Sequence, residues 1–261
     1  MLLAIDVGNT NTVFGSYDEE EPVMNFRIGT DTNRTCDEYG VLIKELFDIE
    51  NRRLSEIQDV IISSVVPDTM HAIESFAVKY CKCKPMIVGQ GLETGLALRY
   101  SDPKELGTDR IVNAVGALNK YKGPLIIIDF GTATTFCVIN EKNEYLGGVI
   151  APGVKISAEA LFEKTSKLPK IELVKPAKYI GASTVTAMQS GVVNGYIGVV
   201  KHILHGITEE LETGKKTTVI ATGGLAGMIC ENIEEVDAIE RNLTLEGLLL
   251  IYKRNKMKEK I

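Results

Sequence analysis

The sequence predicts an α/β protein built from two similar domains, and three observations support this fold class. First, two segments repeat one pattern: an apolar run, then Asp, an apolar residue, Gly and a cluster of small, mostly polar residues. The copies are residues 2–12 (LLAIDVGNTNT) and 125–135 (LIIIDFGTATT). Second, their aspartates, Asp6 and Asp129, lie 123 positions apart (129 minus 6), a typical domain length. Third, strand-like and helix-like segments alternate, which is typical of mixed α/β folds.

We expect the two domains to span residues 1–121 and 122–261, with a nucleotide-binding cleft between them. The chain has 261 residues, of which 44% are hydrophobic, and can bury a substantial core. A single large α/β domain is the alternative.

The first half opens with strands at 2–7 and 12–17, joined by a Gly-Asn-Thr turn. Apolar runs of this length indicate buried strands, and Gly-Asn favours a tight turn. The remaining elements expected here are a strand at 23–28, an amphipathic helix at 37–47, a β-branched strand at 59–66 before Pro67, a helix at 69–80, a strand at 85–88, an irregular stretch at 89–108 and a helix at 110–120 with one apolar stripe.

The second half repeats the strand and hairpin from Leu125. The elements expected next are a turn at 149–154, a helix at 157–167, a long helix at 184–211, a strand at 217–221 before the turn Thr222-Gly223-Gly224, and a terminal helix at 243–252. Each half opens with a strand, a turn and a second strand, whereas in a simple dinucleotide-binding fold a helix follows the first strand. Neither G-x-G-x-x-G nor G-x-x-x-x-G-K-[ST] occurs, which weakens dinucleotide binding and P-loop chemistry.

Composition excludes several classes of partner. The net charge is −6, and nucleic-acid binding usually needs a concentrated basic surface, whereas only the tail at 253–260 is basic. No apolar run approaches the ~20 residues of a membrane helix. The chain enters its first strand without a basic leader segment, so we expect a soluble, cytoplasmic protein with no nucleic-acid or membrane partner. An acidic protein that handles phosphate should need a divalent cation.

Four motifs occur in a fixed order along the chain: DVGNTNT at 6–12, GTDR at 107–110, DFGTATT at 129–135 and TGG at 222–224. This ordered set resembles the type III pantothenate kinases, a family of the acetate and sugar kinase, Hsc70 and actin superfamily, over nearly the whole chain. The resemblance implies two actin-like (ribonuclease H-like) domains with mixed sheets and a cleft. It also implies ATP-dependent phosphorylation of pantothenate to 4′-phosphopantothenate, the first step of coenzyme A biosynthesis.

The resemblance further implies Mg²⁺, a monovalent cation (K⁺ or NH₄⁺), and a cytoplasmic homodimer whose substrate site lies near the subunit interface. Two other functions stay open. A regulatory accessory factor could use the same scaffold, and another kinase or an ATPase could use a different acceptor. The two phosphate turns together with Asp109 favour the pantothenate kinase.

The first phosphate loop is expected at residues 6–13. Gly8 permits a close turn, neighbouring hydroxyls and amides supply donors to phosphate, and Asp6 can orient Mg²⁺ directly or through water. An ordinary hairpin is the alternative. The expected ATP-binding residues of this loop are Asp6, Val7, Gly8, Asn9, Thr10, Asn11, Thr12 and Val13, and the resemblance implies Thr132 as a further one. The resemblance assigns the monovalent cation to Asp129, which could equally close a buried strand.

Asp109 is the candidate general base, because a carboxylate in reach of an attacking hydroxyl can accept its proton. An aspartate near a helix start also often caps the helix, and only the resemblance favours the base. Arg110 can bind a carboxylate or phosphate with two hydrogen bonds, with a surface arginine as the alternative.

The resemblance implies a substrate site of Tyr100, Gly107, Thr108, Asp109, Arg110 and Thr184. Tyr100 could instead be a partly buried core tyrosine. Thr184 resembles a threonine that the family contributes from the partner subunit, but Ser183 or Thr184 is also an obvious helix N-cap. The turn at 222–224 resembles the adenosine-side turn of the superfamily. The glycines at 191, 195 and 198 suit either a dimer interface or internal packing.

Overall fold

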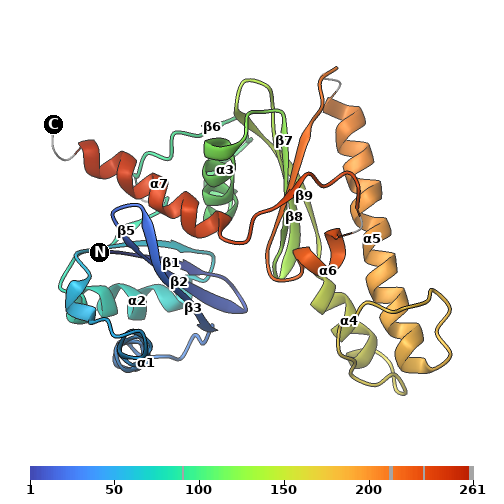
Figure 1. Ribbon diagram of the computed structural model, residues 1–261, viewed down its shortest axis with the longest axis horizontal. Coiled ribbons are helices and arrows are strands. Elements are labelled where there is room, and N and C mark those ends of the chain that lie inside the picture. The colour runs from blue at the N-terminus through green and yellow to red at the C-terminus, as the bar shows by residue number, and fades with distance from the viewer. Residues whose placement is uncertain (90, 212–213, 232, 259–261) are drawn as a thin grey trace. The chain divides into compact units, whose positions relative to one another are not determined.

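The computed structural model describes residues 1–89, 91–211, 214–231 and 233–258, and the chain forms two compact units (Figure 1). Unit 1 consists of Met1–Leu96, Ser101–Gly116 and Asn242–Ile261, and unit 2 of Ala97–Tyr100 and Ala117–Arg241. The predicted domain boundary at 121/122 stays a prediction, and these units differ from it mainly in the C-terminal segment. That segment belongs to unit 1 because its helix packs on strands of the first sheet.

Unit 1 contains a five-stranded mixed sheet in the order β3-β2-β1-β4-β5. Its strands are β1 (Leu2–Val7), β2 (Asn11–Asp18), β3 (Glu21–Gly29), β4 (Asp59–Ser64) and β5 (Met86–Ile87). The first three pair antiparallel, whereas β4 and β5 continue the sheet in parallel. The register of β1 and β4 places Asp6 opposite Ser63.

Helices cover both faces of this sheet (Figure 1). The helices that contribute to unit 1 are α1 (Cys36–Ile49), α2 (Pro67–Tyr80), α3 (Thr108–Lys120), whose last turn belongs to unit 2, and α7 (Leu243–Lys258), with short 3₁₀ turns η1 (Leu54–Glu56) and η2 (Pro103–Glu105). Successive strand residues point to opposite faces, so Leu3 and Ile5 pack with α1 and α2, whereas Leu2 and Ala4 pack with α7.

Unit 2 contains a six-stranded mixed sheet in the order β11-β10-β7-β8-β9-β6. Its strands are β6 (Ala97–Leu98), β7 (Leu125–Phe130), β8 (Ala133–Ile139), β9 (Glu144–Pro152), β10 (Thr218–Thr222) and β11 (Ala238–Ile239). With β6 set aside, the order and directions of the strands repeat those of unit 1, with β7 in the place of β1. The prediction of two similar α/β domains with mixed sheets is therefore confirmed.

One core of unit 2 joins three helices to one face of this sheet: α4 (Val154–Glu163), α5 (Thr184–Leu211) and α6 (Ala226–Cys230) (Figure 1). Ile126 and Ile128 of β7 belong to it, as do Val193 and Val200 of α5. In the part of the chain that the structure describes, no helix has the length and apolarity needed to cross a membrane.

Most predicted elements are present, and the long helix has the predicted bounds. Two predictions in the second half were displaced. The expected turn at 149–154 is mostly strand, since β9 continues to Pro152. The helix expected at 157–167 begins three residues earlier, because Gly153 stands at its N-cap and its carbonyl accepts the Ser157 N–H (2.9 Å). The irregular stretch at 89–108 contains the short strand β6, and α6 and β11 were not predicted.

Candidate active site

The first predicted phosphate loop connects β1 to β2 in unit 1. The Gly8 N–H donates to the Asn11 carbonyl (3.0 Å) and closes a tight turn. The Thr30 hydroxyl donates to the Gly8 carbonyl (2.6 Å) and lies 2.9 Å from the hydroxyl of the buried Thr12. The Thr30 N–H also donates to the Thr10 carbonyl (3.0 Å). The end of β3 therefore holds the loop from behind.

Sequence reasoning missed Thr30, although it lies only two residues beyond the third predicted strand at 23–28. At the tip of the loop, Asn9 and Thr10 are exposed, while Asp6 at the end of β1 is half-buried. The exposed tip offers amide, hydroxyl and backbone donors, which suits a phosphate. The carboxylate of Asp6 suits Mg²⁺, which binds through one or two carboxylates and completes its shell with water and substrate phosphates.

The GTDR segment lies at the same edge of the first sheet as this loop. The Thr108 hydroxyl donates to the Ser64 carbonyl (3.0 Å) and lies 3.1 Å from the Ser63 hydroxyl. Ser63 is the β4 residue that pairs with Asp6 of β1. Thr108 thus ties the start of α3 to the strand ends that precede the loop. Unit 1 alone brings together residues 6–13 and 107–110, a link that periodicity in the sequence does not show.

Asp109 occupies the second position of α3, not its N-cap. Its Oδ1 atom accepts the Arg110 backbone N–H (2.8 Å), so it does bond within the first turn of the helix. Burial raises the pKa of Asp109, opposed by that bond and by the charge of Arg110. A Cβ at Gly107 would lie 2.5 Å from Oδ1, so a glycine there leaves room for the carboxylate. A half-buried carboxylate with a raised pKa is suited to accept a proton.

Arg110 is buried, with 6% of its surface exposed, which rules out the surface-arginine interpretation. A guanidinium placed in the interior beside a candidate base needs anionic or hydrogen-bonding neighbours. Its position next to Asp109 is therefore compatible with a carboxylate-binding role.

The second predicted turn connects β7 to β8 in unit 2 and packs between two glycines. Gly223 has φ +92°, and a Cβ there would lie 2.7 Å from Asp129 Oδ1 and 2.7 Å from the Phe130 backbone nitrogen. A Cβ at Gly153 would lie 2.1 Å from the Thr132 carbonyl oxygen. Glycine is therefore required at both places. The Asp129 carboxylate is half-buried in this turn, beside the Gly223 backbone.

The two remaining predicted substrate residues also lie in unit 2. Tyr100 is half-buried, and its ring meets that of the buried Tyr145 edge-on, with centroids 6.2 Å apart. Thr184 is the exposed first residue of α5. Ser183 is the N-cap, because its Oγ atom accepts the Thr186 N–H (3.2 Å). The predicted site residues thus divide between the units, and the cleft between the domains stays a prediction.

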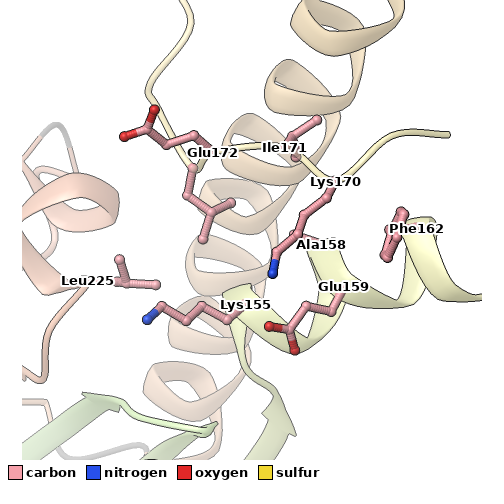
Figure 2. Close-up of a pocket in the computed structure, with 9 residues that line it drawn as sticks. Lys155, Ala158, Glu159, Phe162, Lys170, Ile171, Glu172 and Leu225 are labelled. Atoms are coloured by element: carbon pink, nitrogen blue, oxygen red, sulfur yellow. The ribbon is translucent and has the colours of Figure 1, made fainter.

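A cavity of about 430 Å³ opens next to the turn at 222–224 of unit 2 (Figure 2). Leu225, which directly follows Gly223 and Gly224, forms part of its wall. Lys155, Glu159 and Phe162 of α4 and residues 170–173 contribute most of the rest. A cavity of this volume, with both apolar and charged side chains in its walls, is typical of small-molecule sites. Among the described residues, no three His, Cys, Asp or Glu side chains gather into a metal site of their own.

Three solved structures show the fold of this chain. A protein described as a Baf family transcriptional activator from Campylobacter jejuni is 18% identical, with 98% of this chain and 99% of that chain covered and a TM-score of 0.60. A protein described as a 2-dehydro-3-deoxygalactonokinase from Sinorhizobium meliloti is 11% identical (97% and 96% covered, TM-score 0.59). The ethanolamine utilization protein EutJ from Carboxydothermus hydrogenoformans is 16% identical (95% and 89% covered, TM-score 0.55).

Sequence comparison is more specific than these structural likenesses. The family model of the type III pantothenate kinases matches residues 2–206, well over half of the chain. This match includes the first three motifs of the ordered set. The chain belongs to the type III pantothenate kinases, ATP-dependent enzymes that phosphorylate pantothenate in coenzyme A biosynthesis.

Proposed function

We propose that residues 6–13 and the turn at 129–132 bind the phosphates of ATP, and that Asp109 accepts the proton of the pantothenate hydroxyl. The observation that supports this most strongly is the pair of hydrogen-bonding contacts from Thr108 to Ser63 and Ser64. They tie the start of the Asp109 helix to the strand ends that lead into the loop with Asp6. A base and a phosphate loop on one rigid edge are what phosphoryl transfer to a bound hydroxyl requires.

The proposed reaction transfers the γ-phosphoryl group in line. The terminal hydroxyl oxygen of pantothenate bonds to the γ-phosphorus as the bond to the β,γ-bridging oxygen breaks, so that ADP leaves. The hydroxyl proton passes to a carboxylate oxygen of Asp109. The raised pKa makes this carboxylate a better proton acceptor than an exposed aspartate. Mg²⁺, held by Asp6 directly or through water, would neutralise charge on the phosphates.

The proposed monovalent cation, K⁺ or NH₄⁺, is assigned to Asp129. The half-buried carboxylate at the end of β7 supports the assignment, because a carboxylate oxygen is a suitable ligand for a hard cation. The cavity lined by Leu225 is assigned to the nucleoside end of ATP (Figure 2), since Leu225 directly follows the turn at 222–224 and the walls of the cavity combine apolar and polar groups.

Pantothenate is assigned to the buried Arg110, which would bind its carboxylate, and to Gly107, Thr108, Tyr100 and Thr184. A homodimer is part of the proposal. A Cβ at Gly191, Gly195 or Gly198 would meet nothing within 4 Å, and these glycines follow one another at helical spacing on α5. Ile150 of β9 is also 63% exposed. Such surfaces suit the close approach of a second copy, which would bring its Thr184 near the substrate. The enzyme is proposed to act in the cytoplasm.

The direct test is incubation with ATP, Mg²⁺, K⁺ and pantothenate, followed by separate measurement of ADP and 4′-phosphopantothenate. Equal amounts of both products, dependent on pantothenate, are expected. ADP formed without pantothenate would indicate an ATPase, and the absence of both products would indicate a regulatory protein. Light scattering during size-exclusion chromatography measures the oligomeric state, and the mass of a monomer would contradict the proposed homodimer.

A further inference from the structure

The first phosphate loop contains no positive charge of its own. Residues 6–13 (DVGNTNTV) include no Lys or Arg, and Asp6 adds a negative charge. A triphosphate bound there would need cationic partners from Mg²⁺ and from other segments of the chain. Such a partner in unit 1 would be an arginine or lysine that the fold fixes next to this loop.

Arg34, in the connection between β3 and α1, meets this condition. Its Nη1 atom donates to the Gly29 carbonyl (3.0 Å). Gly29 is the β3 residue that pairs with Asn11, the first β2 residue after the loop. The next residue, Thr30, makes the hydrogen bonds to Gly8 and Thr10 described above. The guanidinium is thus anchored one residue away from the contacts that hold the loop.

The guanidinium is also fixed by an aromatic ring. Its central carbon lies 5.3 Å from the centroid of the Tyr39 ring, within the range of a cation–π interaction. Tyr39 is fully buried, and burial raises the pKa of its hydroxyl, opposed by the charge of Arg34. A capping box of Thr35 and Glu38 fixes the first turn of α1, which positions this ring. The side chain of Arg34 is therefore positioned before any ligand arrives.

The charge of Arg34 is not consumed by an ion pair. In the segments that the structure describes, no carboxylate oxygen lies within 4.0 Å of its guanidinium. The Gly29 carbonyl uses one of its five N–H donors, and a hydrogen-bonding interaction with the Tyr39 hydroxyl takes at most one more. The remaining donors suit the paired oxygens of a phosphate.

We propose that Arg34 binds the β- or γ-phosphate of ATP held in the loop at residues 6–13. The inference rests on the proposed binding of ATP phosphates to that loop. In this role Arg34 supplies the positive charge that the loop lacks and orients the transferred group from the β3–α1 connection.

The test compares the binding of Mg²⁺ with the ATP analogue AMPPNP, by calorimetry, to the whole enzyme and to Arg34→Ala and Arg34→Lys. We expect Arg34→Ala to weaken AMPPNP binding about 10- to 100-fold, as for a lost charged hydrogen bond, and to lower kcat. Binding of AMP, measured by competition, should stay within about twofold. Arg34→Lys should recover part of the loss, because it keeps the charge but not the planar fork.

Arg27→Ala is the matched control. Arg27 is exposed on β3 opposite Val13, and its substitution removes the same charge without touching Gly29 or Tyr39. Its AMPPNP affinity should stay within about twofold of the parent, because an exposed charge in water acts weakly. Thermal melting of each variant excludes loss of fold, and Arg34→Lys keeps the test valid if Arg34→Ala is unstable.

Two results would overturn the inference: unchanged AMPPNP affinity in Arg34→Ala, or equal losses for AMP and AMPPNP. Thr10→Ala separates the inference from its foundation. If Thr10→Ala weakens AMPPNP binding but Arg34→Ala does not, only the role of Arg34 is wrong. If neither variant changes the affinity, the loop itself does not bind the phosphates, and both proposals are wrong.

Discussion

The hairpin turns of the two units join equivalent strands but are held in different ways. In unit 1, residues 8–10 lie outside the strands, and the hydroxyl of Thr30 supports them through the Gly8 carbonyl. In unit 2, only residues 131–132 lie outside the strands, and backbone at Gly153 and Gly223 approaches the turn so closely that no Cβ would fit. The first turn is held by hydrogen bonds from both the hydroxyl and the backbone of Thr30, and the second by direct backbone packing.

This difference indicates different tolerance to change. Hydroxyl groups can rotate and exchange one partner for another, so the first turn can adjust to a ligand. Close-packed backbone has no such freedom, because interiors tolerate little added volume. We therefore expect the chemical step to depend on unit 1, where the proposed base Asp109 and the adjustable loop share an edge, and the fold to depend more strongly on the turn of unit 2.

Asp109→Asn tests the unit 1 half of this comparison and should have the largest effect. The amide keeps the size of the side chain but cannot accept the proton, so kcat should fall by about a hundredfold or more. Melting temperature should change little. Steady-state kinetics with pantothenate varied measures the effect, and a near-normal kcat would show that Asp109 is not the base.

The pH dependence of the parent enzyme also tests Asp109 as the general base. Asp109 must be ionised to accept a proton, and burial raises its pKa above that of an exposed aspartate. Activity should therefore be complete above this raised pKa and should fall as the pH drops through it. The acid limb should be missing from the residual activity of Asp109→Asn. An acid limb that persists unchanged in the variant would assign it to another group.

Gly223→Ala tests the unit 2 half and should have the next largest effect. The added Cβ would enter space within 2.7 Å of Asp129 Oδ1 at a backbone φ of +92°, so the variant should lose about 1–3 kcal/mol of unfolding free energy. The matched change in unit 1 is Gly8→Ala, whose Cβ would lie 3.1 Å from the Asn11 carbonyl oxygen. It should cost less than about 1 kcal/mol. Urea denaturation of both variants measures the difference, and equal losses would remove the distinction between the turns.

Asp129→Ala leaves the packing of the second turn but removes the proposed cation ligand. The KM for ATP should rise about tenfold, the equivalent of ~1.4 kcal/mol, and the response to K⁺ should weaken. Titration of activity with KCl at fixed ionic strength measures this response. A potassium dependence identical to that of the parent enzyme would reject Asp129 as the cation ligand.

Local chemistry explains what the sequence could and could not predict. The duplicated strands were visible because β1 and β7 are continuous apolar runs ending in Asp6 and Asp129. The helix at 154–163 was misplaced because the sequence signal of its start is a glycine rather than a side-chain cap. Thr30 and Ser63 could not be found, because their roles depend on strand pairing across distant segments.

Substitutions at Ser183 and Thr184 should have the smallest effects. Comparing them distinguishes a residue that caps α5 from one that binds substrate. Ser183→Ala removes the N-cap of α5 and should cost about 1 kcal/mol of stability, with pantothenate kinetics nearly unchanged. Thr184→Ala removes no cap and should leave the stability unchanged, but it should raise the KM for pantothenate severalfold if this hydroxyl binds substrate. Because the two positions are adjacent, general disturbance of the helix start would affect both variants alike. Opposite patterns in urea denaturation and in kinetics would therefore assign capping to Ser183 and substrate binding to Thr184, whereas a normal pantothenate KM in Thr184→Ala would remove Thr184 from the site.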